Sequence, residues 1–235
     1  MIVYIMGGLG NQMFQYAAGL GAATILGETL ELNTTFYQQH KDQVRQYRLG
    51  VFPISFQVTD NVAEPIKEKQ HSYQEITQSG MMVGYWQSEK YFDHISDTIR
   101  QEFKLPRATG ISDDMVAVTV RRGDYLSLPD VFAQLDESYY GEARKNFPEG
   151  FFVVFSDDPV WCAENLEWAD LVLPCSDPVH DLALLSSFKN HIIANSSYGW
   201  WGAWLANGNK VIAPKKWFTN GLDDSDLIPD RWIKL

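Results

Sequence analysis

The chain has 235 residues and a mass of 26.8 kDa, and its 45% hydrophobic residues suffice for the core of one large domain or two small ones. The formal charge of −11 excludes nucleic acid as the expected partner, because binding to a phosphate backbone needs a basic surface. No apolar run has the length of roughly 18 residues that a membrane span needs, and the apolar residues 2–6 have no basic leader. We therefore expect a cytoplasmic protein without a transmembrane segment or signal peptide.

The cysteines and histidines do not form a metal-binding pattern. The two cysteines, Cys162 and Cys175, have no Cys-x-x-Cys spacing, and the five histidines are scattered along the chain. Two isolated cysteines in a cytosolic protein are expected to be reduced. The sequence therefore predicts neither a disulfide nor a metal site.

The chain begins as a strand, a glycine-rich turn, a helix and a second strand. Residues 2–6 are a short apolar run, and residues 7–12 read Gly-Gly-Leu-Gly-Asn-Gln. Residues 13–26 contain few helix breakers and are apolar nearly all round, which predicts a helix that is packed on both sides and ended by Gly27. Residues 29–32 form the next predicted strand, so the segment opens a βαβ unit.

The signal weakens between residues 33 and 80, where polar residues and prolines surround short apolar islands, and we expect loops and short helices there. Residues 81–86 predict a strand, and residues 89–105 a helix that Ser88 caps and Pro106 ends. Residues 107–114 have no apolar period. We therefore place the domain boundary between an N-terminal domain at residues 1–106 and a C-terminal domain at residues 107–235.

The second half of the chain alternates more clearly. Strands are predicted at residues 115–120, 151–155, 170–173, 191–194 and 210–213, and helices at residues 135–147, 159–166, 181–189 and 196–206. This alternation indicates a doubly wound parallel sheet, so the expected fold class is α/β. Trp200, Trp201 and Trp204 have helical spacing and are expected to pack the last helix.

Two arginines close the buried strand at residues 115–120. Arg121 and Arg122 are followed by Gly123 and Asp124. Ligands of open α/β sheets bind at the carboxyl ends of strands, and two buried guanidinium groups there are costly unless an anion pairs with them. Because the planar guanidinium group can donate two hydrogen bonds to phosphate, the motif predicts a diphosphate site. The alternative is a surface pair in a turn, bonded to Asp124 and its neighbours.

Three further loops carry candidate site residues. The loop at residues 7–12 allows a ligand close to its backbone, but it fits neither the dinucleotide fingerprint nor the Walker loop, so an NAD enzyme is disfavoured. Its Asn11 is expected either to bond a sugar or reacting hydroxyl, or to cap the helix. The candidates in the three loops are Gly8, Gly10 and Asn11, then Ser156, Asp157 and Asp158, and finally Asn195, Ser196 and Ser197.

The two later loops each have two interpretations. Residues 195–197 offer hydroxyl groups and backbone amides to an anion, or Ser196 is an ordinary helix N-cap. Residues 156–158 accept hydrogen bonds from a guanine edge or a sugar hydroxyl, or an aspartate caps the helix that begins at Pro159. The adjacent Asp157 and Asp158 do not match the Asp-x-Asp pair with which some glycosyltransferases bind a metal.

The chain resembles the α-1,2-fucosyltransferases of glycosyltransferase family 11. The resemblance lies in residues 7–17, 84–92, 120–125, 155–158 and 195–205, in the family's order, within residues 1 to about 218. It implies a GT-B fold with two Rossmann-like halves that face each other across a cleft. It also implies GDP-L-fucose as the donor, inversion at the anomeric carbon and no essential metal or other cofactor. The C-terminal half would bind GDP, and the N-terminal half would face a glycan acceptor, usually a β-galactoside.

The resemblance also implies roles for single residues. Arg121 and Arg122 would hold the diphosphate, with Asp124 ordering them and serving as the base if one is needed. Asn11 would lie near the acceptor hydroxyl. By the same resemblance, Ser196 and Ser197 would add phosphate contacts, and residues 156–158 would lie near the nucleoside.

One position departs from the family pattern. The family's arginine motif usually reads His-x-Arg-Arg-Gly-Asp, and here Thr119 stands in place of the histidine. Threonine cannot carry a positive charge or relay a proton at neutral pH, so any role of that histidine in donor binding or acid–base chemistry is in doubt. Two alternatives therefore accompany the fucosyltransferase interpretation: a GT-B transferase with a different GDP-sugar, and a non-catalytic homologue that binds a nucleotide or glycan.

Overall fold

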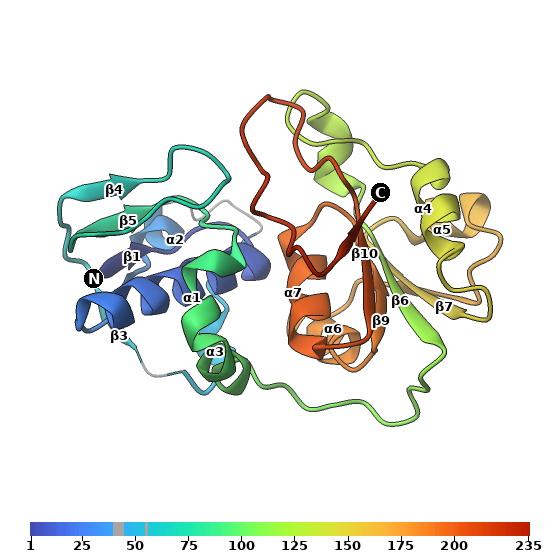
Figure 1. Ribbon diagram of the computed structural model, residues 1–235, viewed down its shortest axis with the longest axis horizontal. Helices are drawn as coiled ribbons and strands as arrows, with labels where there is room; N and C mark the ends of the chain where they lie inside the picture. The colour runs from blue at the N-terminus through green and yellow to red at the C-terminus, as the bar shows by residue number, and fades with distance from the viewer. Residues whose placement is uncertain (40–44, 55) are drawn as a thin grey trace. The chain divides into compact units, whose positions relative to one another are not determined.

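The structure is a computed structural model, and it describes residues 1–39, 45–54 and 56–235. The chain divides into two compact units (Figure 1). Unit 1 comprises Met1–Lys104 and Asp223–Pro229, and unit 2 comprises Leu105–Leu222 and Asp230–Leu235. The sequence placed the boundary after residue 106 and did not assign the segment Asp223–Pro229 to the first unit. No helix in the described ranges has the length and apolar character needed to cross a membrane.

Unit 1 is built on a parallel sheet with the strand order β3-β2-β1-β5-β4. Its strands are β1 (Ile2–Tyr4), β2 (Glu31–Asn33), β3 (Gln57–Thr59), β4 (Pro65–Lys67) and β5 (Met81–Val83). Its α-helices are α1 (Leu9–Leu26), α2 (Thr35–Gln39) and α3 (Ser96–Glu102), and its 3-10 turns are η1 (Leu49–Val51), η2 (Glu89–Tyr91) and η3 (Asp93–Ile95).

Helix α1 is the central helix of unit 1. Most of its residues are buried, as its nearly continuous apolar character predicts. It ends at Gly27, whose left-handed φ of 67° lets its N–H bond the carbonyls of Ala23 and Thr24. The helix begins four residues earlier than the predicted start at residue 13, because the backbone N–H of Gln12 already bonds the carbonyl of Gly8, 3.0 Å away. Asn11 therefore lies in the first turn of the helix rather than in a loop.

Two expectations for unit 1 are wrong in part. Residues 33–80 contain the expected short helices, α2 and η1, but also the strands β3 and β4, which are three residues long and too short for a visible period. The helix expected at residues 89–105 is split into η2, η3 and α3, although Ser88 does cap its start by accepting the N–H of Lys90. The loops expected at residues 40–44 and 55 lie outside the described residues.

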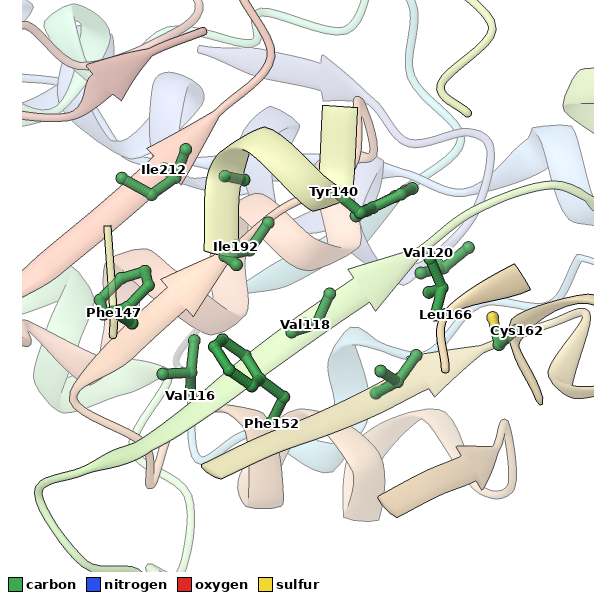
Figure 2. Packing of buried hydrophobic residues seen from close by; sticks show 12 residues of the cluster. Val116, Val118, Val120, Tyr140, Phe147, Phe152, Cys162, Leu166, Ile192 and Ile212 are labelled. Carbon is green, nitrogen blue, oxygen red and sulfur yellow. The ribbon is translucent and has the colours of Figure 1, made fainter. Parts of the chain in front are cut away.

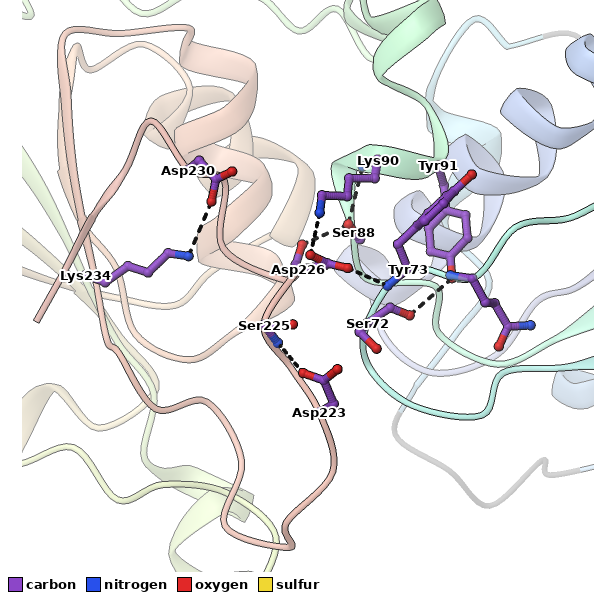
Figure 3. A network of polar contacts seen from close by, with 11 residues as sticks. Ser72, Tyr73, Ser88, Lys90, Tyr91, Asp223, Ser225, Asp226, Asp230 and Lys234 are labelled. Carbon is purple, nitrogen blue, oxygen red and sulfur yellow. Dashed lines mark hydrogen bonds and ion pairs between the residues drawn. The ribbon is translucent and has the colours of Figure 1, made fainter.

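The segment Asp223–Pro229 is anchored within unit 1 by polar contacts (Figure 3). Its Asp226 carboxylate lies 2.5 Å from Lys90 Nζ and accepts the backbone N–H of Tyr73. The Ser88 hydroxyl donates to the carbonyl of Asp226, 2.8 Å away. The next two residues, Leu227 and Ile228, are buried. The segment is therefore an integral part of unit 1.

Unit 2 is a parallel sheet with the strand order β11-β10-β9-β6-β7-β8 (Figure 1). Its strands are β6 (Met115–Val120), β7 (Phe151–Ser156), β8 (Leu171–Pro174), β9 (Asn190–Ile192), β10 (Lys210–Ala213) and β11 (Ile233–Lys234). Its helices are α4 (Glu137–Arg144), α5 (Pro159–Asn165), α6 (Pro178–Leu185) and α7 (Ser197–Ala206), with the 3-10 helix η4 (Gly123–Ser127). The sequence missed only β11 among these strands, because its two residues are exposed.

The core of unit 2 shows how the strands are covered (Figure 2). Alternate residues of β6, such as Val116 and Val118, pack with Tyr140 of α4 and Cys162 of α5. Ala117, from the other face of β6, packs in a second cluster with Leu185 of α6. Helices on both faces of a parallel sheet make a doubly wound unit, which confirms the predicted α/β class. Trp200, Trp201 and Trp204 are buried in α7 as expected, with at most 2% of each exposed.

The order of the strands in unit 2 reverses between β6 and β9. In unit 1 the order of the described strands does not reverse, and the first strand, β1, lies beside the last, β5. In open α/β sheets, ligands bind outside the carboxyl ends of the strands, especially where the strand order reverses. The loops that follow β6 and β9 in unit 2, and those that follow the neighbouring strands β1 and β5 in unit 1, are therefore the first places to look for a site.

Candidate functional site

In unit 2, the reversal point holds a cluster of charged side chains, which we call the arginine cluster: Arg121, Arg122, Asp124, Asp157 and Asp158. Arg121 uses both terminal nitrogens, Nη2 at 2.5 Å from Asp124 and Nη1 at 2.7 Å from Asp157. Arg122 pairs through Nε with Asp158, 3.1 Å away. The arginine side chains are only 25% and 17% exposed. The ion pair of Arg121 with Asp124 was foreseen, whereas the pairs with Asp157 and Asp158, from the loop after β7, were not. Together these pairs fix the orientation of both guanidinium groups.

The loop after β7 organises the arginine cluster. Asp157 accepts the backbone N–H of Arg122 at 2.9 Å, and a Cβ on Gly123 would lie 2.5 Å from its carboxylate, so glycine permits this close approach. Asp158 accepts the N–H of Trp161 and thereby caps α5, which confirms the helix-cap interpretation. The buried Ser156 hydroxyl accepts the N–H of Asp158. In this structure the loop braces the arginines, and its contact with a nucleoside stays a prediction.

Trp161 is a member of this site that the sequence interpretation missed. The guanidinium carbon of Arg122 lies 3.9 Å from the centre of its ring. A cation over an aromatic face is attracted by about 0.5–2 kcal/mol, and the flat contact also limits the rotation of the side chain. The sequence gives one weak signal for Trp161 as a site residue: it is an aromatic residue in the first turn of a helix that follows an Asp-Asp pair.

The terminal nitrogens of Arg122 differ from those of Arg121. Among the described residues, Nη1 and Nη2 of Arg122 have no hydrogen-bond or ion-pair partner, whereas both terminal nitrogens of Arg121 are engaged. Three carboxylates surround two guanidinium groups, so the cluster as a whole is not short of negative charge. An added anion must therefore use the open face of Arg122 or exchange with a carboxylate on Arg121.

The amino terminus of α7 lies at the same reversal point. Ser196 is its N-cap residue, and its side chain makes no capping bond, so the ordinary capping interpretation is wrong. Ser196 and Ser197 are half-buried. Asn195 is buried, and its amide donates to the carbonyls of Ala133 and Trp217 at 2.8 and 3.0 Å, so it holds the loop in place within the unit.

Thr119, which stands where the family histidine is expected, has a structural contact. Its hydroxyl oxygen accepts the N–H of Ala194 at 3.0 Å and so ties β6 to the loop that leads into α7. A Cβ on Gly199 would lie 2.5 Å from the same oxygen. Helix α7 therefore packs directly against Thr119.

An open cavity of about 750 Å³ lies beyond the carboxyl ends of β9 and β10. It is lined by residues of α4 and its approach, by Lys215 and Lys216, and by Leu235. The cavity adjoins the loop after β9, because the Asn195 amide bonds the carbonyl of its lining residue Ala133. Its volume falls within the range of small-molecule sites.

In unit 1, the first turns of α1, which follows β1, and the turn after β5 hold neutral amide side chains, which we call the amide cluster: Asn11, Gln12, Gln15 and Gln87. Gln87 Nε2 donates to Asn11 Oδ1 at 2.8 Å, so Asn11 bonds a side chain from another loop instead of capping α1. A Cβ on Gly7 would lie 2.8 Å from Asn11 Nδ2, so glycine permits this close approach. Gly7 also has a φ of 78°, which favours glycine.

The other amides tie neighbouring loops to α1. The buried Gln12 donates to the carbonyls of Gly7 and Gln46 and accepts the N–H of Arg48. Gln15 accepts the N–H of Met6 and donates to the carbonyl of Gly84. Three amide residues at positions 11, 12 and 15 of an otherwise apolar helix were the available signal in the sequence, and only Asn11 was singled out.

Gly8 and Gly10 are both placed by α1. Gly8 is its N-cap residue with an extended backbone, and a Cβ there would lie 2.9 Å from Nη1 of Arg45. Gly10 is buried in the first turn.

Two phenols near the start of α1, Tyr37 and Tyr47, are neutral at pH 7. Burial raises the pKa of both, and it raises the pKa of Tyr47 to about 12. Among the described residues, no group of three or more His, Cys, Asp or Glu side chains is placed to hold a metal ion.

Comparison with known proteins identifies the family. The family model described as "Glycosyl transferase family 11" matches residues 1–233. The chain belongs to glycosyl transferase family 11. It is 29% identical to an alpha-1,2-colitosyltransferase of Escherichia coli, over 100% of this chain and 98% of that protein. It is 26% identical to galactoside alpha-(1,2)-fucosyltransferase 1 of Bos taurus, over 87% of this chain and 66% of that protein.

Among solved structures, the fold is similar to that of NodZ alpha-1,6-fucosyltransferase soaked with GDP-fucose. The TM-score is 0.49 at 12% identity, over 89% of this chain and 93% of that one. The family and the architecture of two Rossmann-like α/β units, both expected from the sequence, are confirmed. The roles of the individual site residues stay predictions.

Proposed function

We propose that this family 11 glycosyltransferase moves L-fucose from GDP-L-fucose to the 2-hydroxyl group of a galactoside in a glycan, with inversion at the anomeric carbon. The observation that carries the proposal is the arginine cluster at the reversal point of unit 2, in a chain that belongs to this family. Unit 2 would bind the donor and unit 1 the acceptor. The relatives named for alpha-1,2 transfer support the linkage.

The main electrostatic problem of the reaction is the negative charge that develops on the diphosphate as GDP leaves. Arg122 can meet it with two terminal nitrogens without losing its bond to Asp158. Arg121 would exchange Asp124 or Asp157 for phosphate oxygens. The amino end of α7, with Ser196 and Ser197, adds backbone N–H groups and hydroxyls. In this proposal these groups, and not a metal ion, neutralise the leaving group.

The acceptor hydroxyl attacks the anomeric carbon on the side opposite to GDP. The bond from that carbon to the diphosphate oxygen breaks with its electron pair on GDP, the new glycosidic bond forms, and the hydroxyl proton passes to solvent or to a base. A transition state with strong oxocarbenium character needs little deprotonation of the nucleophile, and Asp124 is the candidate base if one takes part. Asn11, whose orientation Gln87 sets, would hydrogen-bond the attacking hydroxyl.

A second donor has specific support. The relative that aligns with the whole chain is named as a colitosyltransferase. Colitose is L-fucose without its 3-hydroxyl group. A site that hydrogen-bonds this hydroxyl discriminates strongly against the deoxy sugar, whereas an apolar site does not. The transfer rates with GDP-L-fucose and with the corresponding colitosyl donor should therefore be compared directly.

The experiment is a transfer assay with a panel of GDP-sugars and other nucleotide sugars on an array of β-galactosides. We expect GDP-L-fucose to give the highest kcat/KM and an α-1,2-linked product, identified by NMR. A preference for a colitosyl donor would replace the donor but keep the site. Binding of GDP in calorimetry without release of GDP from any donor would contradict the proposal and favour a non-catalytic binding protein.

A further inference from the structure

Glu68, which follows β4 in unit 1, is a carboxylate that the reaction as described does not use. Its two oxygens accept the backbone N–H groups of Tyr85 and Trp86 at 2.7 and 2.8 Å. Among the described residues it forms no ion pair. Burial raises the pKa of Glu68, and the two backbone hydrogen bonds counter this only in part. A partly buried carboxylate without a cation is costly, so the contacts it makes are of interest.

The turn that Glu68 holds, residues 84–88, has an unfavourable conformation. Trp86 has a φ of 56°, in the left-handed region that aromatic residues rarely adopt. Its side chain is fully buried, and within the described part of the chain its indole N–H has no hydrogen-bond partner. Such strain persists only where the surroundings determine the conformation, and it is common at functional sites.

Three contacts from different segments of unit 1 determine this turn. Gln15 of α1 donates to the carbonyl of Gly84 at 3.0 Å. Ser88, at the far end, donates to the carbonyl of Asp226 (Figure 3). Glu68 binds the middle of the turn through two N–H groups. Only the contact from Glu68 fixes the peptide groups on both sides of Tyr85.

The residue that follows these peptide groups is Gln87, the partner of Asn11. Gln87 is 7% exposed, and its Nε2 donates to Asn11 Oδ1 at 2.8 Å. Gln87 therefore fixes the orientation of the Asn11 side-chain amide through its Oδ1. A rotation of this turn would move Gln87, and the Asn11 side-chain amide could then flip by about 180°.

We propose that Glu68 is a positioning residue of the acceptor-side site, which fixes the turn at residues 84–88 so that Gln87 holds the Asn11 amide in one orientation. The inference rests on the proposed function for the identity of the ligand, but the positioning itself is a property of unit 1. Because each oxygen of Glu68 accepts a backbone N–H group, we assign this carboxylate to holding the turn and not to proton transfer.

The test compares Glu68→Gln with Glu64→Gln. Glutamine replaces one of the two acceptor oxygens by an NH2 donor, which would face one of the two backbone N–H groups. Glu64 is exposed on the same segment. For Glu68→Gln we expect kcat/KM for the acceptor to fall ~10-fold or more, as misplacement of a contact group does, with unchanged Kd for GDP and an unchanged pH profile. Gln87→Ala should give a similar loss, and the double variant no greater loss than the larger single one. Glu64→Gln should match the wild type.

A second measurement needs no activity. The side-chain amide signal of Asn11 in a ¹⁵N NMR spectrum, assigned with Asn11→Ala, should shift in Glu68→Gln and in Gln87→Ala but not in Glu64→Gln. If the wild type transfers no sugar, the proposed function fails, and this spectrum alone decides the positioning. An unshifted signal in Glu68→Gln overturns the inference. Loss of one limb of the pH profile in Glu68→Gln, with additive effects of Gln87→Ala, also overturns it and identifies Glu68 as a base.

Discussion

The two units place their candidate site residues after neighbouring strands of a parallel sheet, but with different chemistry. In unit 2, the loops after β6 and β7 bring two guanidinium groups together with three carboxylates. In unit 1, the start of α1 and the turn after β5 bring together neutral amides that bond one another and the backbone. A charged leaving group needs full charges to balance it, whereas a neutral sugar is recognised by oriented hydrogen bonds. The difference therefore fits the proposed binding of the donor by unit 2 and of the acceptor by unit 1.

The two sites also differ in how they are held. The arginine cluster depends on ion pairs between side chains that are partly open to solvent, so their partners can exchange when a ligand binds. The amide cluster depends on hydrogen bonds with backbone groups, which leave little freedom. Substitutions in unit 2 should therefore change ligand binding and catalysis directly, and substitutions in unit 1 should act through geometry.

The largest effect is expected from the arginine cluster. Arg122→Ala removes two donors from the developing charge and should lower kcat by about 10² to 10³-fold, or about 3 kcal/mol. Arg121→Ala should have an effect of the same order. Initial-rate kinetics with GDP-L-fucose measure the change, and circular dichroism checks that the fold is retained.

Two controls sharpen this prediction. Arg122→Lys keeps the charge but loses the planar fork, so its activity should fall between those of Arg122→Ala and the wild type. Arg144→Ala removes an arginine that stacks on Trp168 elsewhere in unit 2 and should leave the rate unchanged within a few fold. Wild-type activity in Arg122→Ala would contradict the proposed role of Arg122 in phosphate binding. It would also contradict the contrast between a charged site in unit 2 and a neutral site in unit 1.

A medium effect is expected at Thr119. Thr119→Val leaves the N–H of Ala194 without its acceptor and should lower the free energy of unfolding by about 1–3 kcal/mol. Thr119→His should cost a similar amount through overpacking against Gly199, without a gain in activity. Urea unfolding and transfer rates measure both effects, and Thr119→Ser is the control that keeps the hydroxyl. If Thr119→His were stable and transferred sugar faster than the wild type, threonine at this position would be shown to lower the activity.

The smallest effect is expected at Trp161. Trp161→Leu removes the ring beneath Arg122 and should weaken GDP binding by a few fold, which corresponds to about 0.5–1 kcal/mol. Calorimetry with GDP measures the change. Trp161→Phe should retain most of the affinity, and Trp168→Leu, which removes the ring near Arg144, should leave it unchanged. Equal losses in Trp161→Leu and Trp168→Leu would mean that the stacking has no specific part in binding.

Most elements of unit 2, except η4 and β11, were predictable because neighbouring residues encode them. A short apolar run bounded by turn residues, such as residues 151–155, favours a buried strand, and Asp158 with Pro159 starts a helix by local bonds alone. The arginine pair was visible for the same reason, since a cation after an apolar strand is conspicuous in the sequence. The three-residue strands of unit 1 carry no such pattern, and η2, η3 and α3 were taken for one helix because a shared apolar face does not reveal where a helix is broken.

The partners of the site residues were decided by the tertiary structure. Arg122 and Asp158 are 36 residues apart in the chain, Gln87 and Asn11 are 76 apart, and Thr119 and Ala194 are 75 apart. These pairs form because parallel strands that are distant in sequence lie side by side and place their following loops at one edge. A list of residue types therefore indicates which chemistry is available, and the order of the strands selects the residues that meet to perform it.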